Sequence, residues 1–269
     1  MLRLIRKIAW FVFRMLYACR YRVRVVGGEK LRELKGAVLV MPNHCALVDP
    51  PMLEAYLHRW FPGLIRPIVE SVSYRILLLY PLMRLFRALE VPDPTRDRRE
   101  AVKQTRAMMD RLVDEINRGE SFLLYPSGHL QASGKEVIGT TRAAADILRR
   151  VERVNVVLVR IRGLWGSRFG RVRTGHSPPL GKESIIAIGW LLASLIVFMP
   201  RRTVTLTVEV IPFDSLPELD RKTLNPWLES WYNADLGGGL EKPTYVPYHH
   251  LFGPRGFLSL HILIEYREP

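Results

Sequence analysis

Short apolar runs, typical of buried strands, alternate with longer segments of helical periodicity along most of the chain. The expected strands cover residues 21–26, 36–41, 64–69, 89–91, 121–125, 154–161 and 203–211. The expected helices cover residues 51–60, 74–86, 95–118, 140–150 and 224–235. This alternation predicts an α/β domain with a central mixed sheet, helices flanking the sheet, and loops gathered at one edge.

The chain has 269 residues, enough for one sizeable core plus appendages. We expect a single domain over residues 21–235, an amphipathic helix at 1–20 and a tail at 236–269. A hydrophobic content of 48% excludes a disordered chain and a multi-span membrane protein. Two cysteines, Cys19 and Cys45, form no disulfide framework and favour a reducing compartment.

Residues 1–20 mix bulky apolar side chains with cations, and Arg3, Lys7 and Arg14 share one helical face. The uncharged run within this segment, residues 8–13, is much shorter than the roughly 20 residues that span a bilayer. No small-residue cleavage site of a secretory signal is present. We expect a helix that lies at a membrane interface. An ordinary amphipathic helix packed on the domain is the alternative.

The net charge of +14 indicates an anionic partner. No zinc-finger spacing, RNP-like strand or basic zipper is present, so we expect no nucleic acid and instead an anionic membrane surface. The uncharged stretch 184–199 would span about 24 Å as a helix, short of the ~30 Å hydrocarbon core. We expect it to be buried or membrane-facing rather than crossing. The protein is therefore expected to be peripheral or monotopic on the cytoplasmic face of a membrane.

The strand at 36–41 leads into Pro42-Asn43-His44, and Asp49 follows five residues after the histidine. His44 has the chemistry of a general base near neutral pH. After a turn, Asp49 could accept a hydrogen bond from the imidazole and select its tautomer. The alternative is a loop histidine beside an aspartate that caps the next helix.

Two other chemistries at this loop are disfavoured. One is a nucleophilic Cys45 activated by His44, which is disfavoured because adjacent side chains usually diverge. A zinc site would require distant segments to converge. Its ligands would come from His44, Asp49, His129 and His249 or His250. We therefore predict no metal.

The stretch from Pro42 to Asp49 resembles the first motif of the glycerolipid (lysophospholipid) acyltransferase family, Asn-His-x4-Asp, which includes 1-acylglycerol-3-phosphate acyltransferases. It is complete here as Asn43, His44 and Asp49. The resemblance extends from about residue 20 to about residue 235. It implies that His44 deprotonates an acceptor hydroxyl, which attacks the thioester of acyl-CoA or acyl-carrier protein. It also implies that Asp49 orients His44, and that no cofactor is needed beyond the acyl donor.

The later family motifs are altered. The second motif supplies a Gly and an Arg for the acceptor phosphate, and neither is in register in residues 87–93. The third motif, Phe-Pro-Glu-Gly-Thr-Arg-Ser, becomes Tyr-Pro-Ser-Gly-His-Leu-Gln at residues 125–131, where Ser127 replaces the Glu. The Gly128 amide could stabilise an oxyanion. His129 could contact an acceptor headgroup or be a structural loop residue.

Further substrate contacts are expected from neighbouring loops. Asn43 should shape the loop that holds the base, and Arg142 opens a helix where N–H groups favour anions. The Gly-rich stretch 163–169 either lines an acyl channel or is a simple turn. We expect an O-acyltransferase acting on a lysophospholipid or related lipid. The alternative is a catalytically decayed protein on the same scaffold that binds membranes or nucleic acid.

Overall fold

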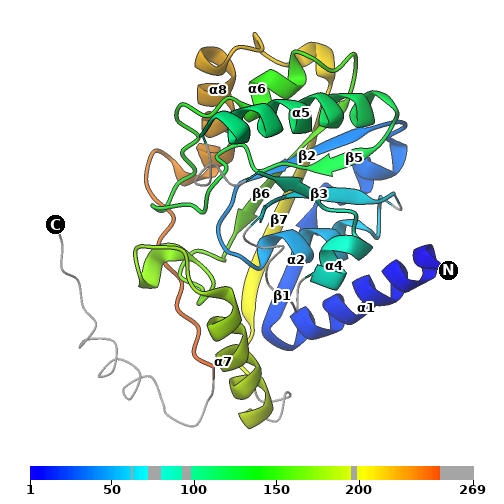
Figure 1. Cartoon of the computed structure of the whole chain (residues 1–269). Coiled ribbons are helices and arrows are strands. Elements are labelled where there is room, and N and C mark those ends of the chain that lie inside the picture. Colours follow the sequence, from blue (N-terminus) through cyan, green and yellow to red (C-terminus); the bar gives the residue numbers. More distant parts are fainter. Residues whose placement is uncertain (62, 72–79, 93–97, 195–198, 249–269) are drawn as a thin grey trace.

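The computed structural model describes the whole chain except residues 62, 72–79, 93–97, 195–198 and 249–269. A seven-stranded sheet with the order β1-β7-β6-β2-β5-β3-β4 forms its centre (Figure 1). The strands are β1 Tyr21–Val26, β2 Val38–Pro42, β3 Ile65–Glu70, β4 Leu89–Val91, β5 Ser121–Leu123, β6 Asn155–Arg162 and β7 Arg202–Ile211. Strands β6 and β7 pair antiparallel and the other pairs are parallel, so the expected mixed sheet is confirmed.

Helices cover both faces of the sheet. They are α1 Leu2–Arg20, α2 Asp49–Leu57, α4 Tyr80–Leu85, α5 Arg98–Asn117, α6 Ala143–Leu148, α7 Leu180–Ala193 and α8 Arg221–Asn233. Short 3-10 turns lie at Gly28–Glu33, Arg171–Arg173, Phe213–Ser215 and Ala234–Leu236. Helices α5, α6 and α8 lie on one face, and α1, α2 and α4 lie on the other (Figure 1). The helix expected at 74–86 is described only from Tyr80 onward, since 72–79 lie outside the described residues.

Strand β2 is buried along its whole length because both faces of the sheet are covered. Leu39 and Met41 join the core under α5, α6 and α8. Val38 and Val40 point the other way and pack with α2. This double burial explains the uninterrupted apolar run that precedes His44.

Helix α1 both packs on the domain and exposes apolar residues. Trp10 is buried and stacks on His58, with 3.5 Å between ring centroids. The Tyr17 hydroxyl donates to the Val48 carbonyl at 3.2 Å, so α1 touches the loop that follows β2. The opposite side leaves Leu4, Ile5, Ile8, Phe11, Val12, Met15 and Leu16 exposed. The expected packing on the domain therefore describes one side of this helix, and the other side is apolar and exposed.

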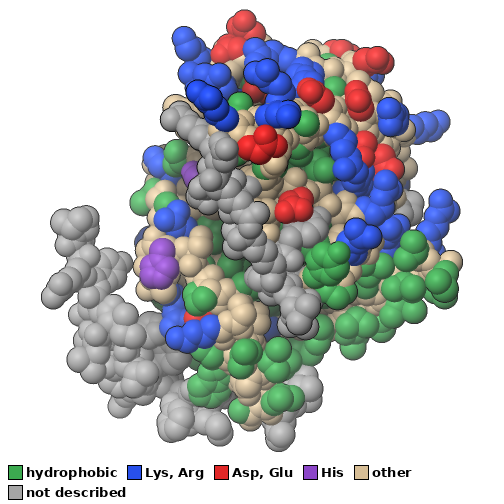
Figure 2. Space-filling model, in the orientation of Figure 1, with side chains coloured by type: hydrophobic (Ala, Val, Ile, Leu, Met, Phe, Trp, Pro, Cys, Tyr) green, Lys and Arg blue, Asp and Glu red, His purple; other side chains and the backbone are tan. Residues whose placement is uncertain are grey.

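Helix α7 has no buried residue among its described side chains, so of the two expected alternatives, buried or membrane-facing, the buried one does not describe this helix. Ile185 is 74% exposed and Leu192 is 63% exposed. Figure 2 shows the apolar side chains of α1 and α7 along one side of the molecule. No helix in the described part of the chain combines the length and hydropathy needed to cross a membrane.

The tail, which had no predicted structure, runs along the domain as far as Tyr248. The Glu241 N–H donates to the Gly134 carbonyl at 2.7 Å, and the Thr244 N–H donates to the Trp165 carbonyl at 3.0 Å. The buried guanidinium of Arg20 donates to the Val246 and Pro247 carbonyls. These contacts hold residues 241–247 against the loops at Gly134 and Trp165 and against the end of α1.

Candidate active site

Two loops meet where β2 and β5 end. The strands are parallel neighbours, with Leu39 opposite Phe122, so their carboxyl ends lie at the same edge of the sheet. The loop after β2 carries His44, and the loop after β5 carries Tyr125. Their rings stack with 3.9 Å between centroids and 26° between planes. The Gln131 N–H also donates to the His44 carbonyl at 2.7 Å, which joins the two loops.

The hydrogen bond expected between His44 and Asp49 is present. Nδ1 of His44 lies 3.3 Å from Oδ2 of Asp49, the first residue of α2. The same oxygen accepts the N–H groups of Cys45 at 2.7 Å and Ala46 at 3.0 Å. Asp49 is fully buried, whereas the His44 side chain is 14% exposed. The carboxylate therefore holds one side of an imidazole whose other nitrogen is free to face a substrate.

Opposing effects act on the ionisation of Asp49. Burial raises its pKa above the ordinary value, and the hydrogen bonds from His44 and from the backbone of Cys45 and Ala46 lower it. These three donors favour the carboxylate form. A carboxylate can only accept a hydrogen bond, so Nδ1 of His44 must carry the proton. Asp49 thus selects the tautomer in which Nε2 is an acceptor.

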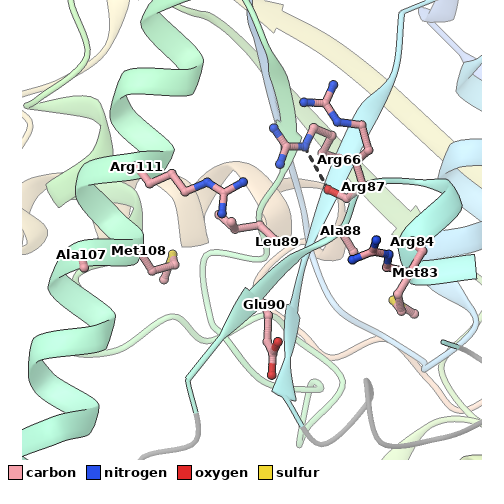
Figure 3. Close-up of a pocket in the computed structure, with 10 residues that line it drawn as sticks. All are labelled: Arg66, Met83, Arg84, Arg87, Ala88, Leu89, Glu90, Ala107, Met108 and Arg111. Carbon is pink, nitrogen blue, oxygen red and sulfur yellow. Dashed lines mark hydrogen bonds between the residues drawn. The ribbon is translucent and has the colours of Figure 1, made fainter.

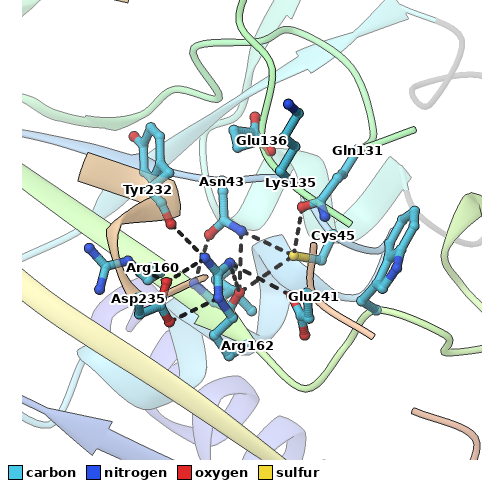
Figure 4. Close-up of polar contacts among 12 residues, drawn as sticks. Asn43, Cys45, Gln131, Lys135, Glu136, Arg160, Arg162, Tyr232, Asp235 and Glu241 are labelled. Atoms are coloured by element: carbon cyan, nitrogen blue, oxygen red, sulfur yellow. Dashed lines mark hydrogen bonds and ion pairs between the residues drawn. The ribbon is translucent and has the colours of Figure 1, made fainter. Parts of the chain in front are cut away.

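Asn43 fastens the loop from behind instead of lining a substrate site. It is buried, its Oδ1 accepts the Ile161 N–H at 2.7 Å, and its Nδ2 donates to the Ile161 carbonyl at 3.2 Å. Nδ2 also lies 3.1 Å from Sγ of Cys45 (Figure 4). The expected substrate contact would require this amide to leave its partners. Asn43 thus ties the end of β2 to β6.

The turn that follows β5 has the sharp geometry expected from its glycine, since Gly128 has φ +69°. Its N–H donates to the Tyr125 carbonyl at 3.0 Å, so the amide expected to face an oxyanion is used inside the turn. Ser127 is buried, and its hydroxyl donates to the His129 carbonyl at 3.1 Å. His129 is exposed, which leaves its proposed headgroup contact sterically open.

The arginines that could bind a phosphate near this site are dispersed or paired. Arg142 is exposed and precedes α6, and its side chain makes no capping hydrogen bond. Arg162 pairs with Asp235 at 2.8 Å between Nη2 and Oδ1. Arg168 pairs with Glu183 at 2.6 Å. A phosphate at the site would have to compete with these carboxylates.

Glu136 is a site residue that no sequence pattern indicated. Its side chain is 1% exposed, and Oε2 accepts the backbone N–H of His44 at 3.4 Å. Asn233 of α8 holds its backbone from both sides, accepting the Glu136 N–H and donating to its carbonyl, each at 2.9 Å. The Ser127 side chain also lies next to this carboxyl group and acts to lower its pKa. Burial raises the pKa of Glu136 to about 7.

The remaining expectations concern Cys45, the Gly-rich loop and metals. Burial raises the pKa of the Cys45 thiol well above its ordinary value, so it is no nucleophile. The Phe169 carbonyl accepts the Leu47 N–H at 3.0 Å, which places the loop 163–169 against the histidine loop. Across the described residues, no group of three His, Cys, Asp or Glu side chains could hold a metal. His249 and His250 lie outside the described residues.

Comparison with known proteins places these features in context. The family described as Acyltransferase matches residues 22–161, just over half of the chain. A comparison with curated proteins gives no significant match. The structure is similar to that of PlsC, the 1-acyl-sn-glycerophosphate (LPA) acyltransferase from Thermotoga maritima, with TM-score 0.57 and 15% sequence identity. The similarity covers 90% of this chain and 81% of that chain, and at this identity it shows a shared fold.

Proposed function

Because the chain belongs to the acyltransferase family, we propose that it moves a fatty acyl group from acyl-CoA or acyl-carrier protein to a hydroxyl of a lysophospholipid or related lipid. The observation that carries this proposal is the bond between His44 and the fully buried Asp49. Burying a carboxylate is costly, and here it is offset by two backbone N–H groups and one imidazole. This arrangement suits a base and its orienting group.

The proposed reaction needs no cofactor beyond the acyl donor. Nδ1–H of His44 donates to Asp49, and Nε2 takes the proton of the acceptor hydroxyl while its oxygen bonds to the thioester carbonyl carbon. When the tetrahedral intermediate collapses, the C–S bond breaks and the thiolate leaves. The proton then passes from Nε2 to the thiolate, and His44 returns to its starting state.

The test is incubation of the purified protein with labelled acyl-CoA, and separately with acyl-carrier protein, against a panel of lysolipids. Products are identified by mass spectrometry. We expect an acylated lipid with at least one donor, and its loss in His44→Ala. If neither donor acylates any acceptor, while the protein is folded and binds vesicles, the proposal is wrong.

The second candidate is a catalytically decayed protein that binds membranes or nucleic acid on this scaffold. The Gly128 N–H is already hydrogen-bonded within its own turn, and it would have to reorient to stabilise an oxyanion. This observation favours the decayed protein. The hydrogen-bonded His44 and Asp49 weigh against it, because a binding surface does not require a buried carboxylate behind a histidine. Vesicle or nucleic-acid binding without any acyl transfer would select this candidate.

We further propose that the protein lies peripherally on the cytoplasmic face of an anionic membrane. The exposed apolar residues of α1 and α7 lie along one side of the molecule (Figure 2). Arg3, Lys7 and Arg14 of α1 are exposed beside that apolar stripe. Apolar side chains would enter the interface while cations meet lipid phosphates.

A further inference from the structure

A cavity of about 630 Å³ lies between the start of β3, the start of β4 and α5 (Figure 3). Arg66 and Leu89 are near the amino ends of their parallel strands, whereas His44 follows the carboxyl end of β2. Strands β5 and β3 lie between β2 and the edge strand β4, so the cavity lies at the β4 edge of the sheet, displaced sideways from His44. Its lining combines four arginines, Arg66, Arg84, Arg87 and Arg111, with an apolar floor that includes Met108.

Carboxylates compensate these arginines only in part. Glu115 pairs with both Arg66 and Arg111, at 2.5 and 2.9 Å. Glu120 pairs with Arg87 at 3.0 Å and lies 3.9 Å from Arg66. Two carboxylates thus serve three guanidinium groups.

The fourth guanidinium increases this imbalance. Arg84 is exposed, and its side chain has no polar partner within the described part of the chain. Glu90 also borders the cavity, but its carboxylate projects away from the guanidinium groups (Figure 3). The cavity accordingly has an excess of positive charge.

The surroundings add a further cation and a constrained backbone. Arg6 of α1 donates from Nε to the Leu85 carbonyl at 2.7 Å, and burial together with the charge of Arg87 lowers its pKa. Among the described residues, Arg87 is the only non-glycine residue with a positive φ, at 52°. Its carbonyl accepts Nε of Arg66 at 2.9 Å. The chain is thus held in an uncommon conformation where these cations meet.

We propose that this cavity binds a phosphoryl group, supplied by an anionic phospholipid headgroup or by a soluble phosphate. Arginine presents a planar fork of donors that matches phosphate oxygens. A bound anion would satisfy Arg84 and relieve the repulsion between Arg6 and Arg87. Arg6 connects α1 to Leu85 next to the cavity, and the exposed apolar side of α1 is the proposed membrane contact, which favours a lipid headgroup as one source. The site is separate from acyl transfer and does not depend on His44.

The test uses Arg84→Gln, which leaves every described ion pair of the cavity in place, and the double variant Arg84→Gln/Arg87→Gln. The matched control is Arg149→Gln/Arg150→Gln, which also removes two positive charges but from pairs with Asp146 and Asp110 on the α5–α6 face. Binding is measured by co-sedimentation with phosphatidylcholine vesicles that contain 0 or about 30% phosphatidylglycerol. Inorganic phosphate is titrated separately by thermal shift.

We expect each substitution of a cavity arginine to weaken binding to the anionic vesicles about fivefold. This is the contribution to binding of one basic residue near such a surface. The control and the wild-type protein should bind alike. If inorganic phosphate raises the unfolding temperature of the wild-type protein but not of Arg84→Gln, a soluble phosphate is a second source of the bound group. If phosphate does not raise the unfolding temperature of the wild-type protein, the site binds only the lipid headgroup. The proposal is overturned if the cavity variants and the control lose vesicle binding equally. It is also overturned if neither loses vesicle binding and phosphate causes no thermal shift. Acyl transfer to a detergent-dispersed acceptor should stay unchanged in Arg84→Gln, so this result is independent of the proposed reaction.

Discussion

The carboxylate of Glu136 accepts the backbone N–H of His44 at 3.4 Å, although 92 residues separate the two in the sequence. Asp49 holds the same residue through its side chain at 3.3 Å. Two buried carboxyl groups therefore hold the proposed base, one through the imidazole and one through the main chain. Glu136 also brings an acidic group next to Ser127, the position where the third family motif has glutamate.

Glu136→Gln should lower kcat while leaving KM for both substrates nearly unchanged. A charge-assisted hydrogen bond is about twice as strong as a neutral one, so a loss of about 1–2 kcal/mol is expected, roughly 5–30-fold. Because the pKa of Glu136 is about 7, the wild-type carboxyl is largely protonated at pH 6 and resembles Gln there. The deficit should therefore be larger at pH 8 than at pH 6. Asp49 and Arg162 also act on this pKa and are unchanged in the variant.

The control for this variant is Glu209→Gln, since the Glu209 carboxylate accepts a hydrogen bond from Trp231 away from His44. It should have wild-type kcat at both pH values. A Glu136→Gln enzyme that loses the same factor at pH 6 and pH 8, or changes only KM, would contradict the positioning role.

His44→Ala should lower kcat by roughly 10²–10⁴-fold, the usual contribution of a positioned base. Asp49→Asn should fall in the same range and remain folded, because an amide oxygen can still accept the N–H groups of Cys45 and Ala46. The Asn amide loses the negative charge that stabilises protonated His44. Steady-state kinetics with thermal unfolding as the folding control measure both variants, and near-normal turnover in His44→Ala would exclude the mechanism.

Glu54 should make the stability of the α1–α2 packing depend on pH. It is 6% exposed on α2, and burial raises its pKa to about 8 from an ordinary value of 4.5. The folded protein binds this proton more tightly than the unfolded chain, so the stabilisation linked to Glu54 is fully present below about pH 4.5 and is lost as pH rises toward 8. Each pKa unit corresponds to about 1.4 kcal/mol. Glu54→Gln should therefore raise the unfolding free energy at pH 8 relative to wild type and have little effect at pH 4.5, measured by denaturant unfolding. An equal effect at both pH values would contradict the assigned ionisation.

The proposed membrane contact is better tested by point substitution than by deleting residues 1–20, because Trp10 and Arg20 are buried in the domain. Ile8→Ser/Phe11→Ser changes two side chains that are 54% and 64% exposed. Losing about 2 kcal/mol of apolar transfer should weaken vesicle binding roughly 30-fold without altering the thermal unfolding. The parallel variant Ile185→Ser/Ile188→Ser reports on α7. If neither pair affects vesicle binding, this side of the molecule does not contact the membrane.

The acceptor should not be lysophosphatidate but a lysolipid with a zwitterionic or amine-bearing headgroup, or another lipid hydroxyl. The second and third motifs lack their arginines, and Arg162 and Arg168 are engaged by Asp235 and Glu183. Each charged hydrogen bond lost from a phosphate costs about 1.5–3 kcal/mol. Side-by-side kinetics on lysophosphatidate and lysophosphatidylethanolamine decide the matter, and a clear kcat/KM advantage for lysophosphatidate would refute the prediction.

Much of the fold could be read from the sequence because its elements are local. Strand β2 follows from a run of apolar residues that is buried on both faces, and α5 follows from apolar residues at helical spacing over its length. The pair His44 and Asp49 was also accessible, because both residues belong to the Asn-His-x4-Asp motif that the chain resembles. The chain alone thus determined the α/β class, the order of the elements and the candidate base.

Tertiary structure decided which polar groups are free. The pattern at residues 125–131 left the Gly128 amide open to an oxyanion, but the folded turn uses that amide at the Tyr125 carbonyl. Asn43 belongs to the expected motif, yet its partners lie on β6, 118 residues away. Glu136 belongs to no motif, and hydrogen bonds to Asn233 of α8 hold it next to His44. Long-range hydrogen bonds and burial depend on how parallel strands and helices pack, and spacing along the chain does not specify that packing.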